Sequence, residues 1–233
     1  MVDGRDLPAQ EFSALTALTG FVHCFTTRVP GIDVGHDKAK ALRRLDGVHQ
    51  EVRAAFRLAD RSFITAEQVH GAGIAVIERL PETDHCFSGC DGLITNQSNL
   101  CLGIYVADCC AVYVVDPVRD VIGLVHSGKK GTELGIVGRA IDEMCSRFGS
   151  FPQDLIVQLS PCIRPPHYEI DFAAQIVRTC TNRGVISVND SGICTACDLE
   201  RYYSYRAEKG KTGRMLALLA LERDALSSRR SSR

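Results

Sequence analysis

The chain has 233 residues, of which 45% are hydrophobic and 24% are charged, and its formal net charge is −1 at pH 7. This composition is typical of a folded globular protein and excludes the disordered and fibrous classes. The nearly neutral charge gives no electrostatic reason to expect nucleic acid or a membrane surface as a partner.

The start of the chain and its cysteines indicate the compartment. Residues 1–10 contain Asp3, Asp6 and Pro8 and lack the apolar run of a secretory signal. The longer apolar segments are interrupted well before the roughly 20 residues that a membrane span needs. The eleven cysteines are an odd number, and several lie inside apolar runs. We therefore predict a cytoplasmic protein with reduced cysteines.

The predicted elements begin with a helix at residues 36–60, where apolar side chains recur every three or four positions and form one stripe. Short runs rich in β-branched residues then predict strands at 73–77, 92–95, 100–106, 111–115 and 121–125. The last two strands are joined by residues 116–120 (DPVRD), whose aspartates and proline are typical of a hairpin connection.

The second half of the chain contains a predicted helix at 132–148, a strand at 154–159 and a helix at 170–180. Because the strands cluster instead of alternating strictly with helices, we predict an α/β (α+β) fold with one mixed or antiparallel sheet. No repeat or long linker divides the sequence. We therefore predict a single catalytic domain over residues 1–226 and a flexible basic tail at 227–233.

Three strong metal ligands lie next to predicted strand ends. His70 follows residues 62–69, Cys109 follows the strand at 100–106, and His126 directly follows the strand at 121–125. Side chains at strand ends can converge while the strands hold the backbone in place. Two imidazoles and a thiolate suit zinc, and copper accepts the same donors. The intervals between them match no compact metal motif, so spacing alone leaves ordinary packed or loop residues as an alternative.

Six short motifs occur in one order along the chain. They are QVHG at 68–71, CDGL at 90–93, ADCC at 107–110, HSGKKG at 126–131, PCI at 161–163 and SYR at 204–206. In this order they resemble the laccase-domain family, also called polyphenol-oxidase-like or multicopper-oxidase-like, whose members are regarded as purine nucleoside phosphorylases. The similarity extends from FTTR at 25–28 to TGRM at 212–215, which is nearly the whole chain.

The resemblance implies a fold, a metal and a reaction. It implies a compact αβα-type domain in which His70, Cys109 and His126 are the catalytic residues and hold a metal, usually zinc. It also implies phosphorolysis of adenosine, inosine, guanosine and methylthioadenosine, with adenosine deamination alongside. The expected partners are therefore a purine nucleoside and phosphate. The chain departs from the family's pattern in two motifs, and both departures concern substrate preference. HSGKKG replaces the family's HAGWRG, and Arg164 replaces the glycine of the family's PCIGP.

Phosphorolysis needs cations that hold phosphate while positive charge develops on the ribose. The candidates are Arg28 in FTTR, Lys129 and Lys130 after the third ligand, and Arg206 in SYR. Lys130 keeps the charge of the family's arginine but not its bidentate fork. Each of these side chains could instead be an ordinary solvated cation.

Other functions use the same residues. Cys109 could be the nucleophile of a cysteine hydrolase, with His70 or His126 as its base. A copper-dependent polyphenol oxidase fits less well, because a multicopper centre needs many more histidines than the seven present. A non-catalytic nucleoside- or metal-binding module is the third alternative. Asp91 and Asp108 could support the site, or they could simply form turns.

Overall fold

The strands of the computed structural model, which describes residues 7–222, form two six-stranded sheets of mixed parallel and antiparallel pairing. In spatial order, the first sheet consists of β1 (Ala9–Gln10), β2 (Phe21–Thr26), β12 (Met215–Leu221), β7 (Leu100–Val106), β3 (Ser62–Ala66) and β5 (His85–Phe87). The second consists of β11 (Ser187–Asp190), β10 (Ile156–Leu159), β8 (Cys110–Asp116), β9 (Val121–Ser127), β6 (Gly92–Thr95) and β4 (Ile74–Ile77).

The main core lies between the two sheets. Phe25 and Leu219 of the first sheet pack with Leu124 and Tyr113 of the second, and all four are buried. The Tyr113 hydroxyl crosses the gap and donates a hydrogen bond of 2.8 Å to the carbonyl of Cys24. The polar atom of this buried ring is therefore satisfied, as burial in an apolar core requires.

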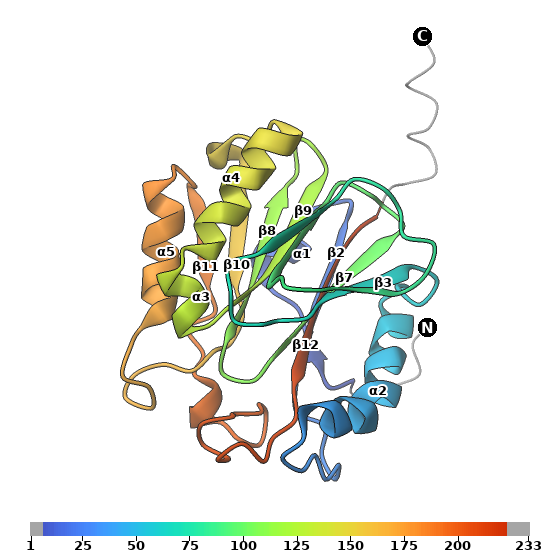
Figure 1. Ribbon diagram of the computed structural model, residues 1–233, viewed down its shortest axis with the longest axis vertical. Coiled ribbons are helices and arrows are strands. Elements are labelled where there is room, and N and C mark those ends of the chain that lie inside the picture. Colours follow the sequence, from blue (N-terminus) through green and yellow to red (C-terminus); the bar gives the residue numbers. More distant parts are fainter. Residues whose placement is uncertain (1–6, 223–233) are drawn as a thin grey trace.

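Helices cover the outer face of each sheet, which gives four layers in the order α, β, β, α (Figure 1). The first sheet is covered by α2 (Lys38–Ala55), and the second by α4 (Ile136–Phe148) and α5 (Phe172–Asn182). Two short helices, α1 (Ser13–Thr16) and α3 (Lys129–Glu133), complete the helical elements with 3₁₀ turns at Pro152–Asp154 and Thr195–Cys197. The predicted α/β class is confirmed, but two mixed sheets replace the single sheet of the predicted αβα arrangement.

The predicted strands and the hairpin at 116–120 are present, whereas the helix bounds differ. The helix predicted from residue 36 to residue 60 is shorter, because Asp37 caps it and Arg57 has a φ of 56° just after its end. The helix predicted at 132–148 is split, because Gly135 has a φ of 74° between α3 and α4. A left-handed residue cannot continue an α-helix.

The central strand of the first sheet, β12, was not predicted. Its sequence MLALLAL is apolar at every position, and all seven residues are buried. The strand is covered on both faces, by the second sheet and by α2, so no alternation of polar and apolar residues exists to reveal it.

Within residues 7–222, three connections carry the chain from the first sheet to the second, and two of them bear candidate ligands of the site. Residues 67–73 link β3 to β4, and residues 107–109 link β7 to β8. Within residues 7–222, none of the helices combines the length and apolar composition that a membrane crossing requires. The basic tail predicted at 227–233 lies outside the described residues.

Candidate active site

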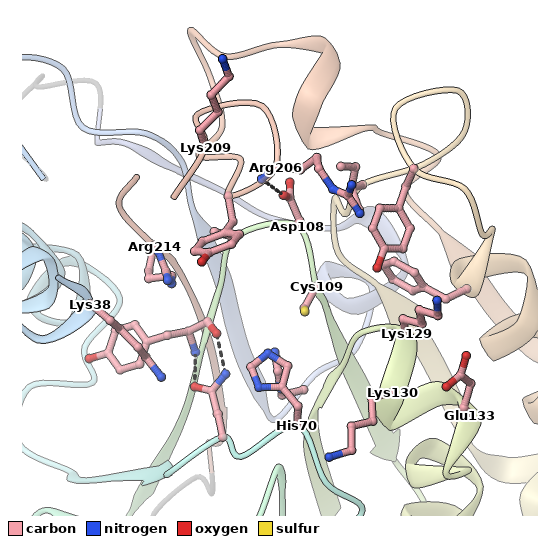
Figure 2. A pocket seen from close by; sticks show the side chains of 18 residues that line it. Lys38, His70, Asp108, Cys109, Lys129, Lys130, Glu133, Arg206, Lys209 and Arg214 are labelled. Carbon is pink, nitrogen blue, oxygen red and sulfur yellow. Dashed lines mark hydrogen bonds between the residues drawn. The ribbon is translucent and has the colours of Figure 1, made fainter. Parts of the chain in front are cut away.

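His70, Cys109 and His126 meet where the two connections cross between the sheets (Figure 2 shows two of them, His70 and Cys109). Their ligand atoms all lie within 4.8 Å of one another. The two imidazole rings stand edge to face with centroids 4.9 Å apart, and both hydrogen-bond the Cys109 sulfur. The structure therefore brings these three sequence candidates together as one group.

One buried carboxylate positions both histidines. Asp91, just before β6, is 0% exposed and accepts backbone N–H groups from Val69 (3.1 Å), His70 (2.9 Å) and Gly71 (2.7 Å). It also lies 2.8 Å from Nδ1 of His126. Burial opposes its ionisation, but the hydrogen bonds from His126 and from the backbone outweigh burial and lower the pKa of the carboxyl group. A proton on Nδ1 leaves Nε2 of His126 as the free donor atom.

The turn that carries His70 has an unusual backbone. Gln68 and His70 have φ values of 64° and 58°, and Asp108, beside Cys109, has a φ of 81°. The Gln68 amide holds this turn against β7, donating to the Tyr105 carbonyl (2.6 Å) and accepting its N–H (3.0 Å). Left-handed residues other than glycine are uncommon and persist where the surroundings enforce them. Here the surrounding contacts fix the backbone of His70 and the backbone next to Cys109, which are two of the candidate ligands.

Gly128 in the HSGKKG motif is required by close packing. A Cβ atom at this position would lie 2.5 Å from the Cys109 sulfur. Any side chain would therefore displace the thiol from the two histidines. This explains the glycine of the motif without assigning it a chemical role.

The Cys109 thiol and the His126 ring favour each other's charged forms. Burial opposes the thiolate, but the charge and hydrogen bond of His126, together with His70, lower the pKa of Cys109 to about 6. Burial likewise opposes the imidazolium, yet Cys109 and Asp91 raise the pKa of His126 to about 9. Without metal, the pair is therefore a thiolate and an imidazolium at neutral pH.

We expect the alkylation rate of Cys109 in chelator-treated protein to rise with pH through about 6. Below this value the thiol holds its proton, and above it the reactive thiolate prevails. The measurement is site-resolved mass spectrometry after brief iodoacetamide treatment at a series of pH values, with exposed Cys86 as a reference thiol in the same digest. A midpoint near the ordinary thiol value of about 8.5 would contradict this assignment.

The group has the chemistry of a metal site. Two imidazole nitrogens and one sulfur that ionises readily form a donor set suited to zinc, and copper accepts the same atoms. The contact from Asp91 to His126 is the kind of carboxylate–histidine support that fixes metal-bound imidazoles. The residues present therefore fit a single metal ion held by His70, Cys109 and His126.

A cavity of about 1060 Å³ opens over this group. Lys129, Lys130 and Arg206 line it, as do the rings of Tyr168 and Phe172. Glu169 pairs with two of these cations, at 3.8 Å from Lys129 and 3.3 Å from Arg206. Three of the four cations proposed for phosphate therefore reach the cavity, and two of them already have an acidic partner.

Arg28, the fourth cation, does not line the cavity. Its guanidinium group pairs with Glu208 at 2.8 Å, donates to the Tyr202 carbonyl and stacks 4.4 Å from the centre of the Tyr203 ring. These contacts tie β2 to the segment that precedes Arg206. The structure thus gives Arg28 an anchoring position away from the other candidates.

Asp108 and Arg164 support the surrounding loops. The Asp108 carboxylate accepts the Thr195 hydroxyl (2.8 Å) and the backbone N–H of Arg206 (2.7 Å), the second of which is drawn in Figure 2. Arg164, which replaces the family's glycine, pairs with Asp190 and donates to the Ile193 carbonyl. Its guanidinium group is therefore engaged with neighbouring loops.

Sequence reasoning missed three cations of the cavity, Lys38, Lys209 and Arg214. Arg214 belongs to TGRM, the last motif of the resemblance, so a signal for it existed. Lys38 belongs to no recognised motif, and only the placement of α2 reveals it.

Known proteins share both the sequence pattern and this fold. The family model described as multi-copper polyphenol oxidoreductase laccase matches residues 23–178 and 170–222. A purine nucleoside phosphorylase of Deinococcus radiodurans is 30% identical, over 86% of this chain and 89% of its own. The purine nucleoside phosphorylase YlmD of Geobacillus stearothermophilus is 27% identical, over 81% of each chain.

Solved structures show the same architecture. YlmD from Geobacillus stearothermophilus superposes with a TM-score of 0.74 at 24% identity, covering 88% of this chain and 93% of its own. The Bacillus licheniformis protein YfiH gives the same TM-score and identity, with 86% and 92% covered. Since the family model spans most of the sequence, this chain belongs to the multi-copper polyphenol oxidoreductase laccase family.

Proposed function

We propose that this protein is a cytoplasmic, metal-dependent purine nucleoside phosphorylase that also deaminates adenosine. The observation that carries the proposal is the group of His70, Cys109 and His126 beneath a cavity lined by cations and aromatic rings. At about 1060 Å³, the cavity is at the upper end of the sizes of small-molecule sites, about 300–1,000 Å³. The relatives named purine nucleoside phosphorylases support the same activity.

The chain's own residues supply binding and orientation. His70, Cys109 and His126 would hold one zinc ion, with copper as the alternative, and a bound metal ion supplies an acidified water for attack on the base. Tyr168 and Phe172 offer ring surface to a purine, while cavity cations stabilise the anion that attacks the ribose. Asp91 orients the His126 imidazole and holds the backbone of His70 in place.

Turnover tests the proposal directly. With adenosine and phosphate, the purified protein is expected to form adenine and ribose 1-phosphate, and hypoxanthine where deamination also occurs. Inosine, guanosine and methylthioadenosine are the further substrates to compare by chromatography. The His70→Ala variant is expected to lose both the metal and deamination. Binding of adenosine without any product would instead support a non-catalytic module.

A cysteine hydrolase remains a second candidate, because one observation favours it. The mutual stabilisation of a Cys109 thiolate and a His126 imidazolium is also the state of an activated cysteine nucleophile. Elemental analysis of protein purified without added metal separates the two candidates. Near-stoichiometric metal supports the phosphorylase, whereas metal-free protein that hydrolyses a substrate and is inactivated by iodoacetamide supports the hydrolase.

A further inference from the structure

Two cations face the cavity from the side opposite the candidates found in sequence. Lys38 is the first residue of α2, and Arg214 directly precedes β12, so both belong to the first-sheet side of the molecule. Lys129 and Lys130 lie in α3 on the second-sheet side. In Figure 2, Lys38 and Arg214 lie on one side of His70 and Cys109, and Lys129 and Lys130 lie on the other.

In the described part of the chain, Lys38 and Arg214 lack acidic partners, as do Lys130 and Lys209 among the other cations of the cavity. Among residues 7–222, no carboxylate lies within ion-pair distance of either side chain. The Nη1 atom of Arg214 donates to the carbonyls of Thr212 (3.2 Å) and Gly213 (2.8 Å), which fixes the guanidinium group. By contrast, Lys129 and Arg206 share Glu169.

The two positive charges also oppose each other. Desolvation and the charge of Arg214 lower the pKa of Lys38, although its side chain is reached by solvent through the open cavity. Desolvation likewise lowers the pKa of Arg214, which is half-buried. Like charges placed together are unfavourable in isolation, and the acidic groups that act on them, Asp91 on Lys38 and Asp108 on Arg214, do not offset the lowering of either pKa. A doubly charged anion between them removes this cost and gains charge-assisted hydrogen bonds.

We infer that Lys38 and Arg214 form the subsite for inorganic phosphate, a cosubstrate role that rests on the proposed phosphorylase function. Arg214 offers a planar group that matches a phosphate edge, and Lys38 offers a mobile point charge. The purine would then occupy the side with Tyr168 and Phe172. The ribose would lie between the purine and the phosphate.

This arrangement accounts for every atom of phosphorolysis. A phosphate oxygen forms a bond to C1′ of the ribose as the bond from C1′ to the purine nitrogen breaks. The electron pair of the broken bond leaves with the purine nitrogen, which receives the proton of hydrogen phosphate. The products are ribose 1-phosphate and the free purine, and no oxidant or reductant is needed.

The experiment compares Lys38→Met and Arg214→Lys with Lys40→Met, each in metal-loaded protein, because Lys40 is an exposed lysine of the same helix that does not line the cavity. We expect Lys38→Met to raise the KM for phosphate about 10- to 100-fold, the effect of one lost hydrogen bond to a charged group, with little change in the KM for adenosine. Arg214→Lys keeps the charge and should show a smaller increase. Lys40→Met should leave the KM for phosphate near that of the wild type.

Direct phosphate binding, measured by calorimetry without nucleoside, separates this inference from the proposed function. Binding that depends on Lys38 in a protein without phosphorolysis would retain the subsite and reject the function. Turnover with an unchanged phosphate KM in Lys38→Met and Arg214→Lys would retain the function and overturn the subsite. If adenosine 5′-monophosphate binding depends on Lys38 while orthophosphate binding does not, the assignment to free phosphate is also overturned.

Discussion

The Cys109→Ser protein is expected to purify almost free of metal and to lose phosphorolysis by at least about 100-fold. Loss of a supporting residue alone typically costs about 10- to 100-fold in metal affinity or activity, and Cys109 is itself a proposed ligand. A serine hydroxyl does not ionise near neutral pH, so it cannot replace a thiolate whose pKa is about 6. Elemental analysis and the adenosine assay measure the two effects.

The neighbouring thiol provides a matched control. Cys110 is fully buried, and its sulfur contacts the backbone of Ala111 and Ser160 instead of the histidines. The Cys110→Ala protein should therefore retain its metal and most of its activity, apart from any loss of stability from the small cavity. Equal metal content in the Cys109→Ser and wild-type proteins would remove the basis of the metal assignment.

The Asp91→Asn substitution is expected to weaken metal binding about 10- to 100-fold and to lower the free energy of unfolding by about 3–5 kcal/mol. The Asp91 carboxylate accepts four hydrogen bonds, three from the backbone of residues 69–71 and one from His126. An amide replaces one acceptor oxygen with an NH₂ group that faces these donors. Urea unfolding and competition with a metal-binding dye measure the two quantities.

Asp120→Asn is the control for a change of aspartate to asparagine. Asp120 is exposed in the β8–β9 turn and has a φ of 53°, a conformation that asparagine tolerates. Its stability and metal affinity should stay close to those of the wild type. A similarly small effect at Asp91 would show that the carboxylate does not hold the two histidines in place.

The pattern of apolar residues predicted most of the second sheet but little of the first. The segments at 92–95 and 121–125 are short, rich in β-branched residues and bounded by turn-forming residues. Their local sequence is therefore sufficient to predict them as strands. The strand Met215–Leu221 consists of leucine, alanine and methionine, which also favour helices. Only the burial of both its faces makes it a strand, and that condition depends on the whole fold.

The site was predictable where motifs marked it and not where packing alone created it. His70, Cys109 and His126 belong to motifs, and the structure brings them together. Arg28 also belongs to a motif, yet its contacts with Glu208 and Tyr203 place it elsewhere. Motif membership does not reveal in which direction a side chain points. Lys38 shows the converse, because it reaches the cavity from a helix without any recognised motif.

The position of β12 has a consequence for synthesis on the ribosome. This strand lies between β2 and β7, although it is the last strand of residues 7–222 to be translated. All strands of the second sheet precede residue 191, so that sheet can pair while the nascent chain is still growing. The first sheet must wait for Met215–Leu221, and until then the apolar inner faces remain uncovered. A premature stop codon upstream of this strand would therefore leave a chain that contains His70, Cys109 and His126 but cannot complete its core.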